Sequence, residues 1–124
     1  MPRSALGVLL RYLREERRFS LRELALLADI DHSYIYKLES GDKESPSDDV
    51  LARLIKHLKP GAREVKMLRF LARHSEADAE VTEYSMKEPS VKFEHFASAA
   101  VMRFRGARPD PKTLIERVRD IIEN

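Results

Sequence analysis

The chain has 124 residues, a formal net charge of +2 and no cysteine, so it can hold one compact domain, or a small domain with an appendage, and neither disulfides nor thiolate metal sites. No run approaches the roughly 18 apolar residues that a membrane span needs, and Arg11 interrupts the N-terminal apolar stretch too early for a signal peptide. We therefore expect a soluble, cytoplasmic protein without a membrane partner, and the nearly balanced charge neither favours nor excludes nucleic acid as a partner.

The first predicted helix covers residues 5–17, where leucines recur at helical spacing. A second helix is predicted to begin after Ser20, whose side chain can cap it. Glu23 lies three residues later and completes a capping box. The sequence therefore predicts two helices in its first 28 residues, separated by a short turn.

Residues 20–41 carry the most informative pattern, which is two short helices joined by the turn Asp29-Ile30-Asp31. Asp31 can cap the later helix, and Ile35 and Leu38 anchor that helix inward. Its outward side chains are His32, Ser33, Tyr34, Tyr36 and Lys37. Such short or planar hydrogen-bonding groups suit base edges and phosphates in a major groove. The pattern is typical of a helix-turn-helix DNA reader.

A fourth helix is predicted after Pro46, with Ser47 as its N-cap, and residues 62–74 form a further amphipathic helix. Connections this short leave little room for a catalytic cleft. The four histidines lack the spacing that places two metal ligands on one helix face, and the chain has no glycine-rich phosphate loop. We therefore expect no catalytic residue, no metal, no cofactor and no enzyme activity.

Residues 6–58 resemble the Cro/lambda-repressor (Xre) helix-turn-helix family in the segments LRYLREERR, SLRELALLA, IDHSYIYKLESG and PSDDVLARLIKHL. The resemblance implies an all-α, lambda-repressor-like domain of four to five helices that binds double-stranded DNA. It also implies a structural ion pair between Arg14 in the first helix and Glu39 late in the third. The residues that it implies for DNA binding are His32, Ser33, Tyr34, Tyr36, Lys37, Ser40, Arg22 and Arg11.

Some of these residues have simpler interpretations. Tyr34 and Tyr36 can pack their rings on the domain, and His32 can be an ordinary solvated side chain. Arg18 and Asp29 stand where relatives commonly have a turn glycine, so both are predicted to adopt a left-handed backbone.

Residues 75–90 contain one basic and five acidic side chains and end in Pro89-Ser90. This composition breaks the apolar pattern, and it predicts a linker or a loop with one turn of helix. The sequence thus divides into a DNA-binding domain at 1–74, an acidic linker at 75–90 and a helical dimerisation tail at 91–124.

The tail is predicted to hold two helices, the first from Ser90 to about Arg105, and the second capped by Asp110 with Pro111 in its first turn. Two short amphipathic helices cannot bury their apolar faces alone. We expect them to pair across the two-fold axis of a homodimer, although folding back as a cap within a monomer is the alternative. The expected dimerisation residues are Phe96, Ala100, Phe104, Leu114, Val118, Ile121 and Ile122.

The segment RFRGARPD is similar to the tail of those Xre repressors that a metallopeptidase of the ImmA/IrrE type inactivates. The resemblance implies a cut between Phe104 and Arg105, whereas the same residues also suit a plain turn between helices. We expect a homodimeric repressor on a palindromic operator. The alternative is an antitoxin-like or adaptor protein whose C-terminal half binds a partner protein.

Overall fold

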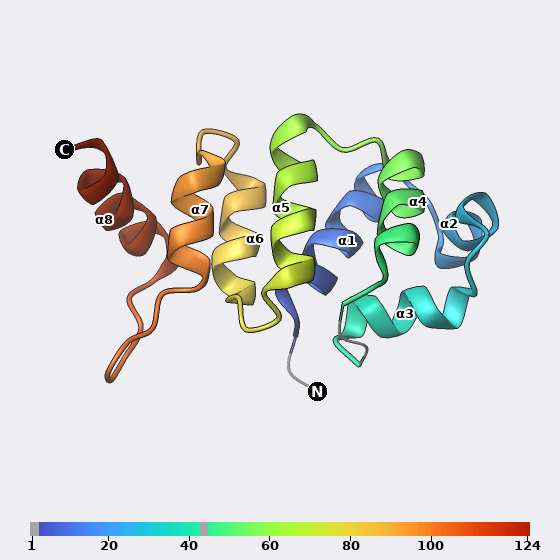
Figure 1. Cartoon of the computed structure of the whole chain (residues 1–124), viewed down its shortest axis with the longest axis horizontal. Helices are drawn as coiled ribbons and strands as arrows, with labels where there is room; N and C mark the ends of the chain where they lie inside the picture. Colours follow the sequence, from blue (N-terminus) through green and yellow to red (C-terminus); the bar gives the residue numbers. More distant parts are fainter. Residues whose placement is uncertain (1–2, 43–44) are drawn as a thin grey trace.

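The computed structural model describes residues 3–42 and 45–124. These residues form eight helices and no strand (Figure 1). The all-α fold expected from the sequence is therefore confirmed. No helix in these two ranges is long and apolar enough to cross a membrane. The helices are α1 (Ala5–Glu16), α2 (Leu21–Ala28), α3 (His32–Ser40), α4 (Asp48–Leu58), α5 (Ala62–Arg73), α6 (Ala79–Lys87), α7 (Phe93–Ala100) and α8 (Pro111–Glu123).

Polar caps start the helices where the sequence predicts them. Ser20 and Glu23 exchange both hydrogen bonds of the capping box at the start of α2. The Asp31 carboxylate accepts the Ser33 amide at the start of α3, and the Ser47 hydroxyl accepts the Val50 amide at the start of α4. Each cap satisfies an amide that has no partner inside its helix, so local sequence fixes these starting points.

The predicted left-handed residues lie at the ends of α1 and α2. Arg18 has a φ angle of 60° and Asp29 one of 55°, so both predictions are confirmed. Lys59, which ends α4, adopts the same conformation with a φ angle of 48°. Ordinary side chains therefore occupy three turn positions that would favour glycine.

Gly7 lies where α1 approaches the end of α3 most closely. A methyl group at this position would lie 2.5 Å from the Glu39 carbonyl oxygen and 2.6 Å from that of Leu38. Both distances are far inside van der Waals contact, and backbone oxygens cannot rotate away. The missing side chain at Gly7 therefore lets α3 lie directly on α1.

Three arginines hold the C-terminal ends of helices other than their own. Arg17 donates to the Leu58 carbonyl at 2.8 Å, and Arg53 donates to the Asp29 carbonyl at the same distance. Arg63 donates to the carbonyls of Ser85 at 2.9 Å and of Glu88 at 3.2 Å at the end of α6, and also to the Val91 carbonyl in the turn before α7 at 2.7 Å. Carbonyls at a helix end have no partner within the helix, so these bonds satisfy them and fasten neighbouring helices together.

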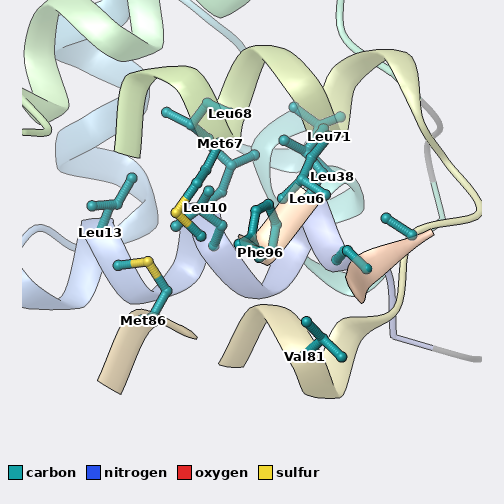
Figure 2. Close-up of a cluster of buried hydrophobic side chains, with 14 of the residues drawn as sticks. Leu6, Leu10, Leu13, Leu38, Met67, Leu68, Leu71, Val81, Met86 and Phe96 are labelled. Carbon is teal, nitrogen blue, oxygen red and sulfur yellow. The ribbon is translucent and has the colours of Figure 1, made fainter. Parts of the chain in front are cut away.

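One hydrophobic core runs through both halves of the chain. α1 contacts α3, α5 and α6, and α6 in turn contacts α7 and α8. Figure 2 shows side chains of α1, α3, α5, α6 and α7 meeting in this core. Leu10, Met67 and Phe96 are at most 1% exposed within it. The C-terminal helices therefore continue the packing of the N-terminal ones.

The sequence predicted a linker at residues 75–90, and the structure has helix α6 there instead. Asp78 caps this helix by accepting the Val81 amide at 2.9 Å. Val81, Thr82, Ser85 and Met86 are all buried. The acidic side chains that suggested a linker lie on the solvent side, and the buried stripe packs against α1.

Helix α7 ends at Ala100, five residues earlier than the sequence predicted. The Asp78 amide donates to the Ala100 carbonyl at 2.8 Å. This bond occupies an oxygen that a longer α7 would have used for its own next turn. Residues 101–110 consequently form a loop, with Gly106 in a left-handed conformation at a φ angle of 83°.

Four of the seven expected dimerisation residues are buried within the chain itself. Phe96 and Ala100 are fully buried, Leu114 is 1% exposed and Val118 is 2% exposed. They face α5, α6 and their own neighbours in the tail, because α7 and α8 fold back on the rest of the chain. The packing therefore contradicts a dimer interface through these four residues. It matches the alternative, in which the tail folds back as a cap on its own chain.

Candidate nucleic-acid interface

The α2-turn-α3 unit presents one face of α3 to solvent. Ile35 and Leu38 are each 1% exposed and point into the core. Helical geometry then turns the intervening positions outward, and His32, Ser33, Tyr36 and Lys37 are all exposed. In Figure 1, α3 lies along the lower edge of the molecule with α1 and α4 above it. This exposed face can enter a groove without any rearrangement of the fold.

Ser33 is tied to the cap of its own helix. Its hydroxyl and its backbone N–H both donate to Asp31 Oδ1 at 3.0 Å. These two hydrogen bonds, with the backbone one contributing most, lower the pKa of Asp31 below its ordinary value. The start of α3 therefore carries an ionised carboxylate, which accepts hydrogen bonds from base amino groups and repels phosphates.

The two tyrosines of α3 lie in different surroundings. Tyr34 is half-buried and packs against the hydrophobic core, whereas Tyr36 is 56% exposed. The ring of Tyr34 thus packs on the domain, as its simpler interpretation predicted. Only the exposed part of this side chain can contact DNA. Tyr36 has its ring available on the outward face.

The expected phosphate-contact residues surround this face. Arg22 is exposed in the first turn of α2, next to amides that helix geometry leaves without an intrahelical partner. Arg11 is exposed on α1, with its Nε 3.5 Å from the Glu15 carboxylate. The Ser40 hydroxyl donates to the Asp42 carboxylate at 3.2 Å, so a phosphate at Ser40 would compete with a neighbouring negative charge.

A bidentate ion pair fixes α3 relative to α1. Arg14 Nε and Nη2 donate to the two carboxylate oxygens of Glu39 at 2.7 and 3.0 Å. The two side chains are 12% and 7% exposed. Arg14 also donates to the Phe19 carbonyl at 2.8 Å. The hydrogen bond that Arg14 donates to Glu39 is the main reason that the pKa of Arg14 is raised, so the guanidinium remains charged at any physiological pH.

Arg53 is a supporting residue that sequence reasoning missed. It donates to the Asp29 carbonyl in the turn between α2 and α3, and its guanidinium also binds the Asp49 carboxylate one helical turn away. The spacing of Asp49 and Arg53 would have indicated their own ion pair. No local pattern connects Arg53 to the turn at Asp29, because the two positions are far apart in sequence.

Across residues 3–42 and 45–124, no group of three histidine, cysteine or carboxylate side chains is placed to hold a metal ion. The exposed face of α3 instead combines an imidazole, a hydroxyl, a phenol and an ammonium group on a rigid helix.

Comparison with known proteins agrees with this geometry. A family model described as a helix-turn-helix domain matches residues 5–68, which is just over half of the chain. No curated protein and no solved structure matches the chain.

Proposed function

Because the chain belongs to the helix-turn-helix domain family, we propose that it is a sequence-specific, DNA-binding transcriptional regulator and has no catalytic role. The observation that carries the proposal is the rigid presentation of α3. Buried Ile35 and Leu38 anchor the helix from within, and the Arg14–Glu39 pair fixes it against α1. Direct readout of a base sequence needs such a fixed helix, because a displacement of about 1 Å breaks base-edge hydrogen bonds.

We assign base reading to His32, Ser33 and Lys37, and phosphate contacts to Tyr34, Ser40, Arg22 and Arg11. Tyr36 lies on the same exposed face and adds an aromatic contact. Base contacts give specificity, whereas phosphate contacts give affinity for any duplex.

The Lys37→Ala and Ser33→Ala substitutions test this assignment. A binding sequence is first selected from random duplexes with the intact chain, and affinities are then measured for that sequence and for an unrelated duplex. Both substitutions should weaken specific binding about 10-fold or more and non-specific binding much less. Lys66→Ala removes an exposed lysine from α5 and serves as the control. An equal loss on both duplexes would refute the base-reading assignment.

We further propose that the chain represses transcription as a homodimer through the far end of α8. Ile121 is 73% exposed and Ile122 is 47% exposed, so the apolar stripe of α8 continues beyond the surface that its own chain covers. Phe104 is half-buried and packs against the core of its own chain, so it contributes less to this surface than the two isoleucines. Pairing two copies would double the number of recognition helices and match a palindromic operator.

Light scattering with Ile121→Asp tests the dimer. This substitution leaves the core intact because Ile121 lies on the surface, and it should convert a dimer into monomers. Glu116→Arg, at an exposed position on the opposite face of the same helix, should leave the mass unchanged. A monomeric intact chain would instead support the antitoxin-like or adaptor alternative, in which the two isoleucines bind a partner protein.

We also propose that proteolysis between Phe104 and Arg105, by a metallopeptidase, inactivates the regulator. The bond lies in the loop between α7 and α8, where Arg105 and Gly106 are exposed. The chain 1–104 is the product of such a cut and can be prepared directly. It should bind the selected duplex at least 10-fold more weakly than the intact chain. Equal binding would mean that the cut does not release DNA.

A further inference from the structure

The loop between α7 and α8 is the most basic irregular segment of the described chain. The loop contains Arg103, Arg105 and Arg108, and its one carboxylate, Asp110, lies at its end and accepts hydrogen bonds from Thr113. All three arginines are exposed. Figure 1 shows the loop projecting from the helical body as a narrow extension. None of the proposed roles of α3 uses this concentration of positive charge.

Contacts within the loop give it a defined shape. Arg108 Nη2 donates to the Met102 carbonyl at 2.8 Å, which closes the base of the loop. The Arg108 guanidinium also lies 5.2 Å from the centroid of the Phe104 ring and covers it. Gly106 forms the tip, and a methyl group added there would meet no atom within 4 Å. The tip therefore offers positive charge and open backbone with little apolar surface, which suits an anionic polymer better than a hydrophobic protein partner.

The arginines of the loop differ in how strongly their charge is neutralised. Hydrogen bonds from the backbone and from His74 are the main causes of the lowered pKa of Glu76, and the charge of Arg103 adds a smaller contribution. Within residues 3–42 and 45–124, Arg105 has no carboxylate within ion-pair distance. Arg105 can therefore bind a phosphate without first breaking an ion pair within the chain.

The position of the loop relates it to the recognition helix. In Figure 1 the tip of the loop and α3 both lie along the lower edge of the molecule, at opposite ends. Helix α3 packs against α1 and α2, which lie above it in Figure 1, so its opposite, exposed face is directed to that edge. A duplex that follows this edge would meet α3 at one end and the loop at the other.

We propose that loop 101–110 is a second DNA contact, which binds the sugar-phosphate backbone of the same duplex that α3 reads. This inference rests on the proposed DNA-binding function. We assign the loop contacts to phosphates only, because an arginine can bind a phosphate whatever the base sequence. Its role is to increase affinity and to fix the direction of the chain along the duplex.

The test uses the full-length chain and the double substitution Arg103→Gln and Arg105→Gln, which leaves Arg108 in place to hold the loop. Binding to a mixed-sequence duplex of about three helical turns is measured as salt is varied. Each lost phosphate contact lowers the slope of log affinity against log salt by about 0.9. We expect the slope to fall by one to two such steps, and the affinity at low salt to fall several-fold.

Two controls make the result specific. Lys66→Gln with Arg69→Gln removes the same charge from exposed positions of α5, and it should leave the slope unchanged. A duplex of about one turn accommodates the α3 contact alone, so on it the loop substitutions should have no effect.

An unchanged slope on the long duplex, with intact binding by the parent chain, would overturn the loop contact and leave the proposed function standing. If the loop substitutions lowered the affinity equally for both duplexes and for poly-glutamate, the loop would bind polyanions in general. This result would also overturn the proposed contact with the duplex that α3 reads. If the parent chain bound no duplex at all, the proposed function itself would fail.

Discussion

At Gly7, a hydrogen in place of a methyl group determines how closely α1 and α3 approach. Alanine in an exposed helix stabilises a protein by about 1 kcal/mol relative to glycine. Here the added carbon would collide with the carbonyl oxygens of Leu38 and Glu39. We therefore predict that Gly7→Ala lowers the free energy of unfolding by about 1–3 kcal/mol, measured by urea denaturation. Its affinity for DNA should fall as well, because α3 must move.

Gly61→Ala is the matched control for this prediction. A methyl group at Gly61 would meet only the Glu64 carboxylate at 2.8 Å, and that flexible side chain can move aside. A loss at Gly61 as large as the loss at Gly7 would show that contact with the α3 carbonyls is not the cause.

The Arg14–Glu39 pair offers a second prediction at the residue scale. Removal of either charge leaves its partner largely buried and unpaired, so Arg14→Gln or Glu39→Gln should each cost about 2 kcal/mol. The double variant should cost clearly less than the sum, because it leaves no unpaired charge. Thermal denaturation of the four proteins measures this coupling. Additive costs would show that the two side chains act independently.

Some features of single residues depend on neighbours in the sequence, and others depend on residues that are far away along the chain. The Ser20 cap depends on Glu23 three positions later, and the sequence predicts it from this spacing. The left-handed backbone of Arg18 is predicted from the resemblance to relatives that have a glycine at this position. The contact at Gly7 depends on carbonyls in α3, and the bond from Arg53 depends on a turn in another helix. Nothing near either residue in sequence indicates these partners.

At the scale of elements, Asp110 makes the start of α8 sensitive to acid. It accepts the Thr113 amide at 2.9 Å and the Thr113 hydroxyl at 2.8 Å. These bonds, the backbone one first, lower the pKa of Asp110 below its ordinary value of 3.8. A folded pKa below the unfolded one means that the cap stabilises α8 above the unfolded value, and that this contribution is lost as the pH falls through the folded value.

We predict that Asp110→Asn removes this acid sensitivity. Asparagine is also a good N-cap but does not titrate, so the melting temperature of the variant should change less between about pH 5 and pH 2 than that of the parent chain. Calorimetry at several pH values measures the difference. Identical pH profiles would assign the acid sensitivity of the protein to other carboxylates.

Helix α6 shows where sequence patterns mislead at this scale. Its acidic composition resembles that of a linker, yet Asp78 precedes a buried stripe at Val81, Ser85 and Met86. The Ser85 hydroxyl is buried and has no hydrogen-bond partner among the described residues. A helix with so polar a buried face forms because α1 and α7 cover it, and sequence alone does not reveal that cover.

For the whole molecule, a shared core predicts that both halves unfold together. Phe96 is fully buried and its ring centroid lies 6.0 Å from that of Phe70. Phe96→Ala should cost about 3–5 kcal/mol, and hydrogen exchange should speed up in α1 and α3 as much as in α7. Leu26→Ala, at a position 85% exposed, is the control. Unchanged protection in α1 and α3 would indicate independent units at 1–74 and 91–124.

The sequence predicts most helices of this molecule but not which of them lie side by side. The leucines of α1 already indicate a buried face, and Leu114 and Val118 indicate another. An apolar stripe has the same appearance whether its partner is the same chain or a second copy. That choice depends on the path of loop 101–110 and on α6, and both were predicted differently from what the structure has.

Loop 101–110 is the only covalent connection between α8 and the surface that α8 covers on α6 and α7. An intact connection of this length holds the helix near its site at an effective concentration of about 1 mM. A cut after Phe104 would leave residues 105–124 as a free peptide, and its rebinding would depend on its actual concentration in the cell. Dilution would then empty the site, and the hydrolysed peptide bond would not reform spontaneously in water. A regulator inactivated in this way returns to its starting state only through synthesis of new chains.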